Sequence, residues 1–169
     1  QNQRKDEKAD ELLKSLVKHL KPENIMTQNA EIMISSIDNL YVNLANLCYT
    51  LNHHDECMLY SNLGVKFMNG VLNNVDLLNK IEFLLKKNKE DLTTFVASQK
   101  MLIAYLFHLI GKCELKKDNI SSALSNYSQA YVIARDIKGE KDEITVKYKK
   151  KFNNLRLMQE NQRKHSDFG

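Results

Sequence analysis

Residues 101–139 read MLIAYLFHLIGKCELKKDNISSALSNYSQAYVIARDIKG, and this stretch decides the fold class. Apolar side chains recur every three or four positions on both sides of the polar break at 117–119, which is the period of an amphipathic helix. Small residues stand among them at Gly111, Ala123 and Ala130. Because two helices approach closely only where the contacting residues are small, the stretch predicts an antiparallel pair of helices.

The same helical period runs through almost the whole chain. Strict alternation of apolar and polar residues persists nowhere, so no sheet is predicted. Five Gly and one Pro in 169 residues also argue against a many-turned β sandwich or barrel. We therefore expect one all-α domain over residues 1–169, with about seven helices. The expected segments are an N-terminal helix at 5–21, a helix pair at 29–72, an intermediate helix at 74–89, a helix pair at 91–139 and a basic capping helix at 141–165.

The residues around Gly111 follow a more specific pattern. Those at four and one positions before it, and at 12, 16 and 19 positions after it, are Phe107, Ile110, Ala123, Tyr127 and Ala130. This spacing resembles the tetratricopeptide repeat, an antiparallel helix pair of about 34 residues. In that geometry Gly111 meets Ala123 across the pair, while Tyr127 and Ala130 pack on the next unit.

A second, degenerate copy of the pattern is centred on Ala45. Its members at the same spacings are Tyr41, Leu44, Cys57, Ser61 and Gly64. The copies are offset by 66 residues, about two repeats, and the segment between them fits poorly, so we expect another helical hairpin or a distorted repeat there. The resemblance implies a right-handed superhelix of antiparallel helix pairs. The alternative is an ordinary helical bundle whose close crossings need Gly and Ala.

The resemblance also implies a protein-interaction or scaffold module of a larger protein, which binds a peptide or helix of a partner in a groove. By the family geometry, the groove residues are Asn39, Val42, Asn46 and Tyr49 from one copy and Tyr105, His108, Lys112 and Lys116 from the other. Of these, Asn46 and Lys112 are expected on exposed faces. Family members that read acidic tails use a Lys/Asn/Arg clamp. Asn46 matches its Asn, but Val42 replaces its Lys, so this specialised function is not expected.

Positive charge gathers near the C-terminus. The chain has 25 Lys and Arg against 21 Asp and Glu, and residues 141–165 hold eight of the former and three of the latter. The basic patch predicted there comprises Lys147, Lys149, Lys150, Lys151 and Arg156. No exposed aromatic residues for base stacking are interleaved with it, so nucleic acid is not the favoured partner. We interpret the patch as a solvated face, with binding to a nucleic-acid or membrane surface as one alternative function and homo-oligomerisation as another.

The sequence offers little for catalysis or for a cofactor. It contains no phosphate-loop, dinucleotide, serine-hydrolase or zinc-protease motif, so we predict a protein that is not an enzyme and uses no cofactor. Cys48, His53, His54 and Cys57 lie close in the sequence. The two cysteines, however, fall on helix-packing positions, and the histidines fall in the turn between them, so no metal site is predicted.

Cysteine usage and the chain ends indicate a compartment. Three cysteines without a spacing motif suggest free thiols rather than a disulfide framework, which favours a reducing, cytoplasmic location. The polar N-terminus lacks Met and resembles no signal peptide, so we expect a piece of a longer protein. The longest apolar run, Met101 to Phe107, is far shorter than the ~20 residues of a membrane span, so no transmembrane segment is predicted.

Overall fold

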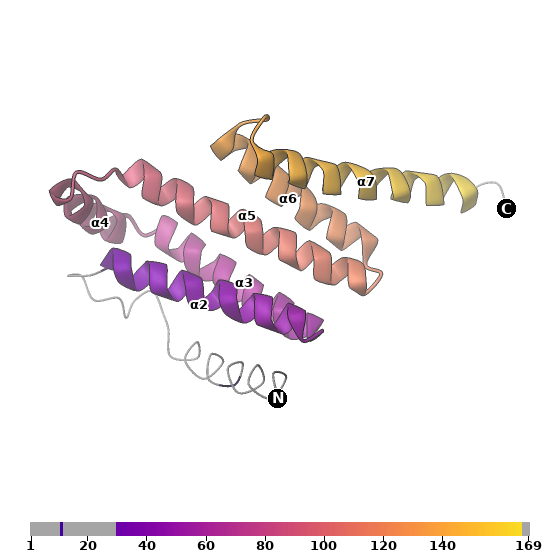
Figure 1. The fold of residues 1–169 in the computed structure, drawn as a ribbon, viewed down its shortest axis with the longest axis horizontal. Coiled ribbons are helices and arrows are strands. Elements are labelled where there is room, and N and C mark those ends of the chain that lie inside the picture. Colours follow the sequence, from indigo (N-terminus) through magenta and orange to yellow (C-terminus); the bar gives the residue numbers. More distant parts are fainter. Residues whose placement is uncertain (1–10, 12–29, 167–169) are drawn as a thin grey trace.

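Figure 1 shows the computed structural model of the chain, which describes residue 11 and residues 30–166. Over this part of the chain it has six helices and no strand, which confirms the all-α prediction there. The helices are α2 (Ala30–Thr50), α3 (His54–Leu72), α4 (Val75–Lys87), α5 (Leu92–Lys116), α6 (Ile120–Lys138) and α7 (Glu143–Ser166). The helix predicted at 5–21 lies, apart from residue 11, outside the described residues.

The helix ends follow from local capping chemistry. The Asn74 side chain accepts a hydrogen bond of 3.0 Å from the backbone N–H of Leu77, and this cap starts α4. The Asp91 carboxylate accepts one of 3.0 Å from the backbone N–H of Thr93 and starts α5. At the other end of the fold, α6 stops at Gly139, whose φ of 89° is one that residues with a Cβ rarely adopt.

The helices pack in chain order, with one exception. α2 packs on α3, α3 on α5, α5 on α6 and α6 on α7, whereas α4 contacts α3 and α5 only lightly. The hairpins α2–α3 and α5–α6 are therefore direct neighbours, and α4 lies beside the end of the stack at which α5 begins (Figure 1). The segment between the two sequence copies is thus a single helix of 13 residues and not a further hairpin.

The predicted contact of Gly111 with Ala123 is confirmed. A Cβ placed on Gly111 would lie 3.2 Å from the carbonyl oxygen of Ala123 and 2.6 Å from Cδ1 of Tyr127. No real Cβ tolerates the shorter of these distances, so α5 and α6 reach this separation only because residue 111 is glycine.

Gly64 and Ala130, which occupy the same place in the two copies, are both buried among residues that include one of the following helix. A Cβ on Gly64 would lie 3.1 Å from Cβ of Tyr41 in its own hairpin and 2.8 Å from Cδ1 of Leu106 on the following helix, α5. Ala130 is buried in a cluster with Tyr148 of the following helix, α7. A small residue at this position therefore lets each hairpin accept the next helix.

The largest core cluster joins α2, α3, α4 and α5, and two smaller clusters attach α6 and α7 to it. Of the helices in the described ranges, α5 is the one long and apolar enough to span a membrane by length and composition. Half of its most apolar stretch of 18 residues is buried inside the protein. The core helix of a soluble protein can have the same length and composition, so these two properties alone do not indicate a membrane span.

Candidate functional site

The groove residues predicted from the two copies lie on α2 and α5, and four of them meet in pairs. The Tyr105 hydroxyl donates a hydrogen bond to Oδ1 of Asn46. The ammonium nitrogen of Lys112 lies 4.1 Å from the centre of the Tyr49 ring, in a cation–π contact. Asn46 and Lys112 are half-buried rather than exposed, because each packs on a side chain of the facing helix.

The remaining predicted groove residues differ in accessibility. Asn39 and Lys116 are exposed, and Val42 is half-buried against the main core cluster. His108 is only 6% exposed, so it does not line an open groove. His108 is buried because α7 packs over it, whereas the sequence predicted this helix as a cap that leaves His108 in the groove.

His108 instead stands in a stack of three rings. Its ring centre lies 5.2 Å from that of Tyr127 on α6 and 4.7 Å from that of Tyr148 on α7. Burial, together with the nearby positive charges of Lys112, Lys147 and Lys151, lowers the pKa of His108 to about 4. The ring is therefore neutral at neutral pH and serves packing between three helices.

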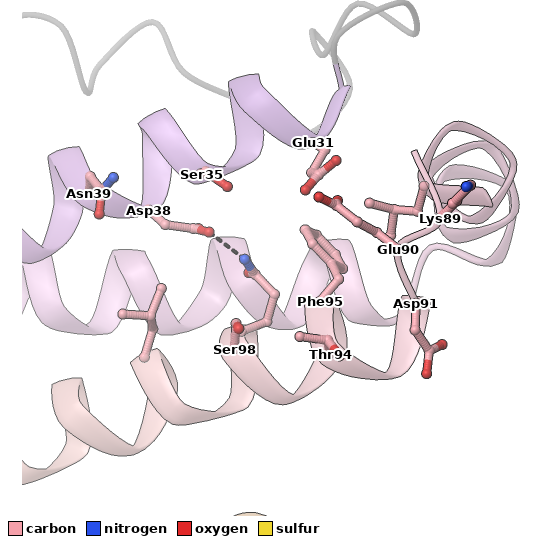
Figure 2. A pocket seen from close by; sticks show the side chains of 13 residues that line it. Glu31, Ser35, Asp38, Asn39, Lys89, Glu90, Asp91, Thr94, Phe95 and Ser98 are labelled. Atoms are coloured by element: carbon pink, nitrogen blue, oxygen red, sulfur yellow. Dashed lines mark hydrogen bonds between the residues drawn. The ribbon is translucent and has the colours of Figure 1, made fainter. Parts of the chain in front are cut away.

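An open cleft of about 630 Å³ lies between α2, the α4–α5 connection and the first turns of α5 (Figure 2). Asn39 is the predicted groove residue that lines it. The charged residues in its lining are Glu31, Asp38, Lys89, Glu90 and Asp91. Four carboxyl groups against one ammonium group make this cleft the acidic part of the α2–α5 face.

The floor of the cleft is a buried polar pair that bridges the two helices. Asp38 is 1% exposed and Gln99 is 2% exposed. The Gln99 side-chain amide donates a hydrogen bond to Oδ2 of Asp38 (Figure 2). Asp38 Oδ1 and Gln99 Oε1 have no hydrogen-bond partner among the described residues. A buried acceptor left in this state costs about 1–3 kcal/mol, so two of them side by side call for an explanation.

Burial disfavours the ionised form of two carboxyl groups in the cleft. Burial, opposed in part by the hydrogen bond from Gln99, raises the pKa of Asp38 to about 6. Burial also raises the pKa of Glu31, and the negative charge of Glu90 adds to the effect. Positive charge placed in the cleft would stabilise all three carboxylates.

The sequence analysis missed this pair. Asp38 falls on the stripe of buried residues that includes Ile34 and Tyr41, and Gln99 follows Phe95 by one helical turn on the core face of α5. The sequence did contain one indication of a site here, namely a polar residue on each apolar stripe. Polar residues are buried at core positions only when they have hydrogen-bond partners or serve a function.

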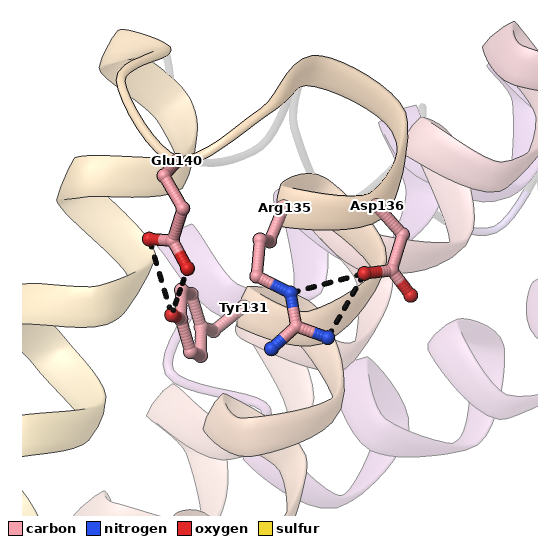
Figure 3. Close-up of polar contacts among 4 residues, drawn as sticks. All are labelled: Tyr131, Arg135, Asp136 and Glu140. Carbon is pink, nitrogen blue, oxygen red and sulfur yellow. Dashed lines mark hydrogen bonds and ion pairs between the residues drawn. The ribbon is translucent and has the colours of Figure 1, made fainter.

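The residues of the predicted basic patch lie on α7 and differ in their partners. Lys149 pairs with Glu140 at 3.2 Å, and Glu140 also accepts a hydrogen bond of 3.0 Å from the Tyr131 hydroxyl (Figure 3). Arg156 lies 3.8 Å from Glu160 on its own helix. Lys147 and Lys151 are exposed and lie near enough to His108 to lower its pKa, and Lys150 is exposed as well. Two of the five positive charges of the patch are therefore paired with carboxylates.

The three cysteines are buried, and none of them forms a disulfide. In the described part of the chain, no group of three or more His, Cys, Asp or Glu side chains is arranged to hold a metal ion. Comparisons with protein families, with curated proteins and with solved structures found no match to the chain.

Proposed function

We propose that this chain is a protein-interaction module of the tetratricopeptide type, which binds a segment of a partner protein on the face formed by α2 and α5. The observation that carries the proposal is the open cleft between these helices, whose floor holds two buried acceptors without a partner among the described residues. Solenoids of stacked helix pairs use such a face, lined by the first helix of each pair, for peptides and helices.

The contacts between the hairpins support the repeat interpretation. Gly64 and Ala130 hold equivalent positions and both lie where their hairpin receives the next helix. The offset of 66 residues is then one repeat lengthened by α4 and its connections, which accounts for the missing middle copy. In this interpretation α2 and α5 are the first helices of adjacent repeats, and α7 is the first helix of the unit that follows.

Charge on the α2–α5 face suggests how a partner is oriented. The acidic cleft lies at the end near Glu31 and Glu90, whereas the positive charges of Lys112 on α5 and of Lys147 and Lys151 on α7 lie near His108, further along α5. Complementary charge fixes the register of a bound segment more than it adds to affinity. We therefore propose a partner segment with its basic residues toward the cleft, bound by a scaffold without catalytic activity in the cytoplasm.

The alternative of an anionic surface bound by α7 has less support. Two of the five charges of the predicted patch, Lys149 and Arg156, are engaged in ion pairs with carboxylates. Binding to a nucleic acid or a lipid headgroup requires several phosphates to be contacted from one face.

A peptide selection tests the proposed function. Peptides are selected from a random library on the immobilised chain, and a selected peptide is titrated into ¹⁵N-labelled chain, with its scrambled sequence as control. We expect the shifted amide resonances to gather on α2 and α5 around Asn39 and Ser98. Shifts that gather on α7 and vanish steeply with salt would contradict the proposal, as would a selection that yields no peptide better than its scrambled control.

A further inference from the structure

We propose that the cleft between α2 and α5 is a subsite for an arginine side chain of the partner segment. The inference rests on the proposed function, because it specifies the chemistry of the part of the partner that enters the cleft.

The unpartnered atoms at the floor demand a donor. Asp38 Oδ1 and Gln99 Oε1 come from facing helices, and both atoms are acceptors only. Their residues are more than nine-tenths buried, so a ligand that satisfies them must enter the cleft rather than cover it. A ligand carboxylate or phosphate offers no donor and would add negative charge to a site that already holds Asp38.

The charge around the floor selects a cation. Glu31 and Glu90 lie toward one another at the mouth, and the ammonium group of Lys89 is the one positive charge in the lining (Figure 2). Glu90 repels Glu31 strongly enough to contribute to the raised pKa of that carboxyl. A cation placed between them relieves this repulsion and pairs with Asp38 at the same time.

The shape and lining favour guanidinium over other cations. Guanidinium presents five N–H donors in a plane and can serve acceptors on two helices at once, whereas an ammonium group is a compact donor of three. Phe95 lines the cleft and, although it is only 7% exposed, supplies the aromatic ring of the lining that a guanidinium group could contact. Leu102, which is half-buried, adds apolar surface for the methylene stem. A divalent metal ion would need a set of ligands that the described residues do not assemble.

Small probes test this subsite without a partner protein. N-acetylarginine methylamide, its citrulline analogue and its lysine analogue are each titrated into the ¹⁵N-labelled chain. Citrulline has the same length as arginine but a neutral urea group. We expect the arginine probe to shift the resonances of Asp38, Gln99 and their neighbours in a saturable way, with at least tenfold weaker binding of citrulline and an intermediate affinity for lysine. Equal binding of arginine and citrulline, or shifts outside the cleft, would overturn the proposal.

Substitutions in the cleft show which carboxylates contribute to the affinity for the arginine probe. Asp38→Asn should weaken the arginine probe at least tenfold, and a melting curve shows whether the variant is folded. Because Asp38 is buried, the double variant Glu31→Gln/Glu90→Gln provides a second test at the mouth of the cleft, where it should weaken the probe about threefold to tenfold. Glu160→Gln on α7 is the matched control and should leave the affinity unchanged. Wild-type affinity in both cleft variants would overturn the proposal.

The arginine subsite and the interaction function fail in different ways. If a selected peptide binds the α2–α5 face and replacement of each of its arginines by citrulline has no effect, the subsite is wrong and the interaction function stands. If the arginine probe binds in the cleft but no peptide can be selected, the subsite stands and the interaction function is wrong.

Discussion

The missing side chain of Gly111 sets the separation of α5 from α6. We predict that Gly111→Ala lowers the free energy of unfolding by about 1–3 kcal/mol, because the new Cβ would lie 2.6 Å from the Tyr127 ring, which is stacked on His108 and has little room to turn. Gly64→Ala is the comparison. Its nearest neighbour is a terminal methyl of Leu106 at 2.8 Å, which can rotate away, so this change should cost less. Urea melts of both variants measure the difference, and equal losses would contradict the account of the α5–α6 crossing.

His108 makes the fold sensitive to acid. Its pKa is about 4 in the folded chain against 6.5 for an ordinary histidine, so the unfolded chain takes up the proton first. The stability that this group contributes is therefore present above about pH 6.5 and is lost as the pH falls toward 4, by roughly 3 kcal/mol in total. His108→Phe keeps the stack of rings and cannot be protonated. We predict that the variant loses less stability than the parent between pH 7 and pH 4.5 in thermal melts, and a parallel loss in both proteins would refute this role.

Asp38 has the opposite dependence on pH. Its folded pKa of about 6 lies above the ordinary 3.8, so the folded chain holds the proton more tightly and the free energy of unfolding falls as the pH rises from about 4 to about 6. Asp38→Asn removes this dependence. We predict that the variant gains up to about 3 kcal/mol relative to the parent over that range, measured by urea melts at pH 4, 5, 6 and 7. A difference that does not change with pH would show that Asp38 is not desolvated as the structure has it.

At the scale of elements, α4 is the helix least attached to the rest. It contacts α3 and α5 only lightly, and its ring of Phe83 is 62% exposed. We predict that Asn74→Ala, which removes the cap, weakens α4 by about 1 kcal/mol and raises amide hydrogen exchange there alone. Asp91→Ala removes the matching cap of α5 and should lower the melting temperature of the whole chain. Faster exchange throughout α5 and α6 in Asn74→Ala would contradict the independence of α4.

The helices themselves were predictable from sequence, because each carries an apolar stripe of the helical period and a recognisable end. Asn74 as a cap, Gly139 as a stop and Gly111 at a crossing are examples in which the local sequence and the structure agree. Asp38 and Gln99 were not predicted as a site, because each fills one position of a long stripe. Their pairing depends on how α2 and α5 face each other, and the two residues lie 61 positions apart in the chain.

At the scale of the whole molecule, the order of packing was the unpredictable part. The sequence of α4 does not indicate that this helix lies outside the stack, so that α3 packs directly on α5. For the same reason His108 was expected in a groove, although α7 covers it. Contacts between segments far apart in the chain depend on burial summed over several helices, which a periodic pattern within one helix does not contain.

The whole-molecule account also predicts how salt and charge act on binding. If the α2–α5 face is the binding site, the triple change Lys149→Gln/Lys150→Gln/Lys151→Gln should alter the affinity of a selected peptide less than threefold. Any such change should come from the association rate and not from the dissociation rate. Surface plasmon resonance at 50 and 200 mM salt separates the rates. A loss of binding in the triple variant would instead support the anionic-surface function of α7.

The measurement closest to the central claim is the binding of a selected peptide to Ser98→Arg. Ser98 is exposed on α5 and lines the cleft, so the new guanidinium group can occupy the acidic floor from within the chain. Ser125→Arg, at an exposed position of α6 outside the cleft lining, is the matched control. Isothermal titration should show at least tenfold weaker binding to Ser98→Arg at an unchanged or higher melting temperature, and parental affinity for Ser125→Arg. Parental affinity for Ser98→Arg would contradict the claim that the partner binds in the cleft between α2 and α5.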